Sequence, residues 1–205
     1  MRTIIVIAFV CLALNTLSEG QGEPKPTLGT GPLSAEKVAI YRIVLADYRK
    51  GTKDALNLAD RTEPLQRSEG SSDLGCISGI KLADPNSAPA LHRIDSSTAL
   101  GPGLVLVDPD RQQERINEND PQNLVKRAID DHEQVTDKQL DDSIKRAFET
   151  GLFTLSEIAF HEGHRYAVVA YSFVCGGLCG NGKTLLLKKV GHKWRVIKAC
   201  GEWVS

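Results

Sequence analysis

The 205-residue chain has room for one domain of moderate size or two small ones. Its hydrophobic content of 41% and charged content of 25% are those of an ordinary soluble globular protein. A formal net charge of −1 gives no reason to expect nucleic acid or an anionic membrane as a partner. Aromatic residues make up only 5%, and several lie in the last quarter of the chain, so we expect the best-packed core there.

Residues 1–20 have the pattern of a secretory signal peptide. Arg2 supplies a positive charge, an apolar run follows from Ile4 to Leu17, and small residues stand at Ser18 and Gly20. The run is too short to span a membrane comfortably, and the polar stretch behind it argues against a buried core helix. We therefore expect a secreted or periplasmic protein, without a membrane span once this peptide is removed.

Cleavage would leave four cysteines, and an even number in an exported chain favours disulfide bonds. Three pairings are available to four cysteines. We favour Cys76–Cys200, which would tie the middle of the chain to its end, together with Cys175–Cys179. The second pair closes a short ring, which must meet strict geometric requirements.

Residues 21–33 are rich in Pro, Gly and Thr and predict a flexible leader, whereas 34–205 predict a single α+β domain. Ser34 is a good N-cap for the first helix. The apolar stripe of this helix recurs at helical spacing and consists of Val38, Tyr41, Leu45 and Tyr48. A strand is expected within residues 53–62.

The segment 63–102 is rich in Ser, Pro, Asp and Gly and predicts a loop, which is unusually long for a compact domain. It is either a functional excursion or contains a small helix around Pro89 to Arg93. A short buried strand is expected at 104–107, ended by Asp108-Pro109-Asp110.

A pair of helices should follow. Asp120 with Pro121 begins the first, and a capping box from Thr136 to Gln139 begins the second, which ends at Gly151. We expect both helices to bury their apolar stripes. These stripes are Leu124, Ala128 and Ile129 in the first helix and Leu140, Ile144 and Phe148 in the second.

The last quarter of the chain predicts a four-strand antiparallel meander. The strands are expected at 153–160, 166–174, 183–190 and 194–199, with turns at 161–164 and at Gly191-His192 and a Gly-rich loop at 175–182. The run 166–174 is apolar at both odd and even positions, which indicates a central strand covered on both faces. By analogy of fold alone, a cone-shaped sheet of the cystatin or NTF2 type is the nearest architecture.

Residues 177–184 match the phosphate-binding pattern G-x-x-x-x-G-K-T. A nucleotide site of this type needs a helix directly after Lys183-Thr184, but only a short run separates these residues from the turn at Gly191. The remaining chain is also too short for a βαβ nucleotide-binding fold. We therefore expect the glycines to serve the loop itself, and we expect no nucleotide cofactor.

Zinc-type ligands also gather near the end of the chain, at Cys175, Cys179, His161, His164 and His192. The spacing C-x3-C is a loose signal, and His-Glu-Gly-His lacks the spacing of a zinc motif. In a regular meander the loop at 175–182 would also point away from both histidine turns. We therefore expect disulfide chemistry rather than a metal site.

The motifs Cys-Gly-Gly-Leu-Cys-Gly at 175–180, Lys-Trp at 193–194 and Trp-Val-Ser at 203–205 resemble a group of uncharacterised secreted bacterial proteins. These proteins share a C-G-x-L-C-G loop, a following G-K-W hairpin and a W-[IV]-S ending. The likeness covers the last quarter of the chain specifically and the N-terminal helix and strand loosely. It implies a bacterial exported protein with a β-meander core, and it brings no activity, ligand or catalytic residue.

Two functional hypotheses follow. The first is a non-catalytic binding module for another exported protein or a small anion, with the binding residues on the Gly-rich loop. These residues are Gly176, Gly177, Gly180, Gly182 and Lys183, whose backbone N–H groups and charge could form an anion-binding nest or a fixed surface.

The second hypothesis is a secreted hydrolase in which His161 or His164 works with Glu157 or Glu162, because histidines and carboxylates crowd this hairpin. The same residue types are ordinary in turns, and no catalytic triad or paired catalytic carboxylates accompany them. We therefore favour the binding module.

Overall fold

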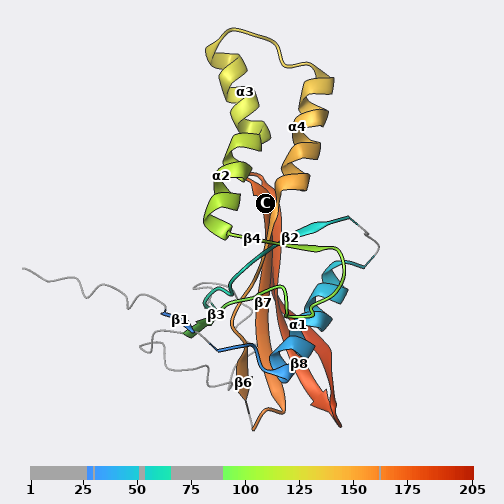
Figure 1. Ribbon diagram of the computed structural model, residues 1–205. Helices are drawn as coiled ribbons and strands as arrows, with labels where there is room; N and C mark the ends of the chain where they lie inside the picture. The colour runs from blue at the N-terminus through green and yellow to red at the C-terminus, as the bar shows by residue number, and fades with distance from the viewer. Residues whose placement is uncertain (1–26, 30, 51–53, 66–89, 162) are drawn as a thin grey trace, which may run out of the picture.

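The computed structural model describes residues 27–29, 31–50, 54–65, 90–161 and 163–205. Within these ranges the chain forms an α+β fold with four helices, one seven-stranded mixed sheet and a separate two-stranded sheet (Figure 1). The expected signal peptide at 1–20 and Cys76 lie outside the described residues. No helix within the described ranges is long and apolar enough to cross a membrane.

The first half of the chain supplies one long helix and short strands. In chain order the elements are β1 (Thr27–Gly29), α1 (Ala35–Tyr48), β2 (Leu56–Ala59), β3 (Ala90–His92) and β4 (Leu104–Val107). β1 and β3 pair in parallel with each other, so residues 27–29 of the expected leader form a strand. The small helix considered near Pro89 to Arg93 is likewise wrong, because β3 occupies that place.

The second half begins with three helices, α2 (Pro109–Asn119), α3 (Pro121–Asp130) and α4 (Asp137–Thr150). Five strands follow, β5 (Leu152–Leu155), β6 (Ala159–His161), β7 (Tyr166–Gly176), β8 (Cys179–Val190) and β9 (Lys193–Val204). The large sheet has the order β4-β2-β5-β7-β8-β9, with β6 paired to β7. β2 runs parallel to both β4 and β5, whereas β5, β7, β8 and β9 form the antiparallel meander that the sequence predicts. The first expected strand, 153–160, is divided into β5 and β6, which both pair with β7.

Helix α1 lies on one face of this sheet and forms the main core with it. Ser34 caps the helix as predicted, because its side chain accepts the N–H of Lys37 at 3.3 Å. Tyr41 and Leu45 of the predicted stripe are buried, and the hydroxyl of Tyr41 donates to the carbonyl of Ser156 at 2.9 Å. Burial raises the pKa of this tyrosine strongly, so it remains a neutral donor.

Strand β7 is covered on both faces, as its apolar sequence predicts. Ala167 and Val169 belong to the main core under α1, whereas Val168 packs with Leu186 and Cys200 on the opposite face. The turn at Gly191-His192 is also confirmed, since Val190 pairs directly with Lys193.

The expected Gly-rich loop at 175–182 is wrong. Residues 179–182 belong to β8, and Gly176 pairs with Cys179 across a turn made by Gly177 and Leu178. The Cys175–Cys179 disulfide that the sequence predicts spans this turn, with 5.1 Å between the two Cα atoms. Cys200 is also disulfide-bonded, while its expected partner Cys76 lies outside the described residues.

Helix α2 is not predicted by the sequence pattern. The side chain of Asp108 accepts the N–H of Arg111 at 3.0 Å, so Asp108-Pro109 begins a helix rather than merely ending β4. Its one large buried apolar residue, Ile116, packs against Ala59 and Leu152 at the end of the sheet.

The expected burial of the α3 and α4 stripes is wrong, although α4 meets the sheet through Ala147 of the main core and through Phe148, which stacks on Phe173 of β7 with 6.3 Å between ring centres. No residue of α3 is buried, and α4 buries only Ser143 and Ala147. Ile129, Ile144 and Phe148 have the spacing of core residues but are 67%, 40% and 57% exposed. In Figure 1 the two helices stand beyond the end of the sheet, joined at their far ends, and the C-terminus lies at their base.

Candidate functional site

An apolar groove of about 630 Å³ lies between α3, α4 and the β7–β8 turn. Its walls are made by Pro121, Val125 and Ile129 from α3 and by Leu140, Ile144 and Phe148 from α4. Leu178 and Cys179 of the turn line it as well. On each helix the apolar residues recur every four positions, so each presents one continuous stripe to the groove.

The groove exposes more large apolar side chains than stability alone would favour. Ile129, Phe148 and Leu178 are 67%, 57% and 71% exposed. Contiguous apolar surface of this kind on a folded domain marks an interaction site, whereas single exposed apolar residues are common. The buried residues of α4 are the small Ser143 and Ala147, and Ala147 lines the groove beside Phe148.

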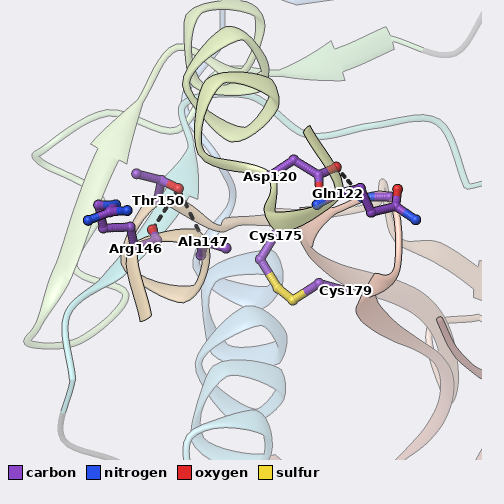
Figure 2. Close-up of a disulfide and its surroundings, with 8 residues drawn as sticks. Asp120, Gln122, Arg146, Ala147, Thr150, Cys175 and Cys179 are labelled. Atoms are coloured by element: carbon purple, nitrogen blue, oxygen red, sulfur yellow. Dashed lines mark hydrogen bonds between the residues drawn. A yellow bond between two sulfur atoms is a disulfide. The ribbon is translucent and has the colours of Figure 1, made fainter. Parts of the chain in front are cut away.

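The turn that forms the base of the groove is fixed to the start of α3. The carboxylate of Asp120 uses both oxygens: Oδ1 accepts the N–H of Gln122 at 2.9 Å, and Oδ2 accepts the N–H of Gly177 at 2.8 Å. Figure 2 shows the Cys175–Cys179 disulfide between Asp120 at the start of α3 and Ala147 near the end of α4. The disulfide and the Asp120 carboxylate therefore hold the base of the groove in one arrangement.

The five residues predicted to form an anion-binding nest are divided among the end of β7, the turn and β8. At the turn, the N–H of Gly177 donates to the carboxylate of Asp120, so this N–H is already used by an anionic group of the same chain. A Cβ atom on Gly177 would lie 2.4 Å from Oε1 of Gln122, and one on Gly176 would lie 3.1 Å from Oδ1 of Asp120. Gly176 also has a φ of 152°, which favours glycine, whereas the close neighbour of Gly177 is the flexible end of the Gln122 side chain.

The other three residues lie in strand β8. Gly180 and Gly182 lie beneath the indole ring of Trp203, and a Cβ atom on Gly182 would lie 2.3 Å from its Nε1. The side chain of Lys183 forms an ion pair with Glu202 at 2.7 Å. The phosphate-binding pattern at 177–184 is therefore accounted for by packing within the chain.

Two residues of the hydrolase hypothesis, Glu157 and His164, belong to separate clusters. Glu157 binds His92 rather than His161 or His164, with 2.8 Å between Oε1 and Nδ1. His164 pairs with Glu36 at 2.9 Å and stacks on Phe160 with 4.2 Å between ring centres. His161 ends β6, and Glu162 lies outside the described residues.

Glu157 instead belongs to a partly buried polar cluster of Lys37, Thr62, His92 and Glu157. Its Oε2 accepts from Nζ of Lys37 at 3.1 Å, and its Oε1 accepts from the hydroxyl of Thr62 and the backbone N–H of His92. Burial alone would raise the pKa of Glu157, but the hydrogen bonds from Thr62, His92 and Lys37 outweigh it and lower the pKa.

This cluster fastens α1, β3 and the segment before β6 to one another. Nε2 of His92 lies 3.3 Å from Nζ of Lys37, so the imidazole faces a cation rather than a nucleophilic hydroxyl. Both oxygens of Glu157 are occupied. The cluster therefore has a structural role. No local sequence pattern indicates it, because its members lie far apart in the chain.

No group of three or more potential ligands for a metal ion occurs among the described residues. Cys175 and Cys179 are bonded to each other, so their sulfurs are not free thiolates. The turn between them and the turn at His192 lie at opposite ends of β8, as the regular meander predicts.

Comparison of the chain with models of protein families, with curated proteins and with solved structures found no match.

Proposed function

We propose that this protein is a non-catalytic, exported binding module whose groove holds an amphipathic helix of a partner protein. The observation that carries the proposal is the exposure of the α3 and α4 stripes, which line a shared groove instead of the core. The N-terminal export pattern and the disulfide chemistry support an oxidising compartment outside the cytoplasm.

The shape of the groove fits a helix. α3 and α4 contain 10 and 14 residues, which corresponds to lengths of about 15 and 21 Å. Their stripes are joined at one end by Leu178 of the turn. A third helix laid between them would bury all three apolar surfaces at once, which is the helix-in-groove mode of recognition.

The charge of the groove indicates what that helix should carry. Asp120 and Lys126 both line it, but the carboxylate of Asp120 is fully engaged with Gln122 and Gly177. Lys126 forms no ion pair within the part of the chain that the structure describes. A partner helix should therefore have an acidic residue beside its apolar stripe, where it would meet Lys126.

The base of the groove is already ordered, which favours binding. The disulfide and the Asp120 hydrogen bonds fix the turn, so its ordering adds little to the entropic cost of association. The hydrolase hypothesis has no such support, since Glu157 and His164 take part in separate clusters.

A displayed library of helical peptides tests the proposal. It is selected on the mature protein and, in parallel, on the variant Ile129→Asp/Ile144→Asp, with Val190→Asp/Ile197→Asp as a control. The control residues are 52% and 49% exposed and lie on β8 and β9 away from the groove. Peptides enriched on the wild type and the control should repeat apolar residues every three or four positions, carry an acidic neighbour and bind the groove variant at least tenfold more weakly.

Equal binding to the groove variant would contradict the proposal. Two other results would also overturn it by identifying a different occupant. Self-association that is lost in the groove variant would indicate a second copy of the chain, and displacement of a fluorescent fatty acid without any peptide selection would indicate a small amphiphile. Circular dichroism on both variants checks that the fold is retained.

A further inference from the structure

Four cationic side chains lie on one face of β8 and β9, at the end of these strands remote from the groove. Lys188 pairs directly opposite Arg195, Lys198 is opposite Leu186, and Lys193 is opposite Val190. Directly opposite residues of an antiparallel pair lie on the same face, and alternate residues of β8 share a face. Lys188, Lys193, Arg195 and Lys198 therefore form one surface, which we term the cationic face.

The cationic face is not neutralised by the chain. Its four side chains are exposed, and none of them forms an ion pair within the described residues. Neighbouring lysines of β8 behave differently, because Lys183 pairs with Glu202 and Lys189 pairs with Glu36, both at 2.7 Å. Acidic partners are thus placed beside the other lysines of β8 and not on this face.

The pair Lys188–Arg195 also costs stability. Like charges directly opposite each other on neighbouring strands repel, and burial does not force these two residues into place. The ammonium of Lys188 lies over the ring of Tyr166, 5.6 Å from its centre, and this contact attracts the cation but supplies no negative charge. A concentration of positive charge without an acidic partner among the described residues indicates an external anion.

We propose that the cationic face binds a linear acidic polysaccharide through its carboxylate or sulfate groups. Lys193, Arg195 and Lys198 follow one another along β9, which is the edge strand of the sheet. The steps from Lys193 to Lys198 along an extended strand cover about 17 Å, so these charges lie along a line that an extended polymer can follow. Arg195 supplies a planar fork that pairs bidentately with carboxylate or sulfate.

The surroundings disfavour other polyanions. Single-stranded nucleic acid is held by aromatic rings that stack on bases. Tyr166 is covered by the ammonium of Lys188, and Trp203, which is 45% exposed on the same face, lies opposite Gly182 toward the other end of β8. A membrane presents a plane of charge, whereas three of the four cations lie along one strand edge. The site is separate from the groove, so the inference does not depend on the proposed partner helix.

The test uses the mature protein and measures binding to polygalacturonate, which carries carboxylates, and to dextran sulfate. Lys188→Ala/Arg195→Ala is compared with the control Lys138→Ala/Arg115→Ala, which removes the same two charge types from exposed helix positions. We expect the first variant to bind at least about fivefold more weakly and the control to bind like the wild type. Binding of the wild type should weaken as salt is raised.

An equal loss in the control variant would overturn the proposal, because it would show attraction to overall charge alone. Tighter binding to a single-stranded oligonucleotide, or to vesicles containing phosphatidylglycerol, than to either polysaccharide would also overturn it. Preference for polygalacturonate or for dextran sulfate identifies the carboxylate or the sulfate as the recognised group. Thermal unfolding shows that the variants remain folded, since removal of opposed like charges does not weaken the sheet.

Discussion

The carboxylate of Asp120 accepts the backbone N–H of Gly177 at 2.8 Å, although 57 positions separate the two residues in the chain. The same carboxylate caps α3 through the N–H of Gln122. One side chain thereby joins the beginning of a helix to the tip of a β-hairpin, and both of these elements border the groove. The position of Leu178 relative to α3 depends on this link.

We predict that Asp120→Ala loosens the hairpin tip as well as the helix. Loss of an N-cap costs about 1–2 kcal/mol, and the unpaired N–H of Gly177 adds to this. Hydrogen exchange should become faster at 176–179 and in the first turn of α3. Asp108→Ala is the matched control, because Asp108 caps α2 at 3.0 Å without contacting the hairpin. Equal loosening of the tip in both variants would contradict the link.

The beginnings of α1, α3 and α4 can be predicted from the sequence alone. Ser34, Asp120 and Thr136 are capping residues whose side chains accept backbone N–H groups in the structure as predicted. Helix α2 is harder to predict because Asp108-Pro109 also ends a strand, and because the sequence behind it is polar except for Ile116. Capping chemistry depends on neighbours in the chain, which is why local sequence is enough to identify it.

The groove could not be predicted, because periodicity shows which residues share a face but not what covers that face. Ile144 and Phe148 have the spacing of core residues, yet they are 40% and 57% exposed, although Phe148 stacks on Phe173 of β7. The role of Gly182 could not be predicted either, because the local sequence resembles that of a loop. Glycine is needed at this position because Trp203, which is distant in the sequence, is brought against it by the pairing of β8 with β9.

Gly182→Ala should displace Trp203 from the sheet. The new methyl group would lie 2.3 Å from Nε1 of the indole and 2.9 Å from the backbone carbonyl oxygen of Tyr171, so the ring must move. We expect a loss of about 1–3 kcal/mol in the free energy of unfolding and a red shift of tryptophan fluorescence. Gly31→Ala is the control, since a Cβ atom at that position would have nothing within 4 Å. Unchanged fluorescence would show that Trp203 does not rest on Gly182.

Removal of the Cys175–Cys179 disulfide should weaken the groove more than the fold. Cys175 is fully buried, so Cys175→Ala/Cys179→Ala avoids placing a polar group in the core. Opening so short a ring costs about 2 kcal/mol in the chain-entropy model. We expect the sheet to persist by circular dichroism, while groove-selected peptides bind more weakly. Complete unfolding would show that the disulfide holds the domain rather than the site.

The Glu157 cluster predicts a dependence of stability on pH. Burial raises the pKa of Glu157, but its hydrogen bonds outweigh that effect and lower the pKa from its ordinary value of 4.5. The folded state therefore binds this proton less readily than the unfolded state, so the stabilisation is complete above the ordinary value. It is lost as pH falls below 4.5 toward the lower folded value. Urea unfolding of the wild type should weaken across this window more steeply than that of Glu157→Gln. Glu149→Gln, at an exposed position, should follow the wild type.

Stability and ligand binding place opposite demands on the cationic face. Arg195→Glu converts the repelling pair with Lys188 into an attracting one and keeps the contact of Lys188 with Tyr166, so it should raise the free energy of unfolding by about 0.5 kcal/mol. Lys193→Glu is opposite Val190, so it relieves no such pair and should leave stability nearly unchanged. Both variants should lose affinity for the acidic polysaccharide, because each replaces a cation by an anion on the same face.

Denaturation midpoints at low and high salt check the effect on stability, since the gain from Arg195→Glu should shrink as salt screens the pair. If Arg195→Glu lowers stability instead, Arg195 is required by the fold, and the cationic face offers no support for a ligand site.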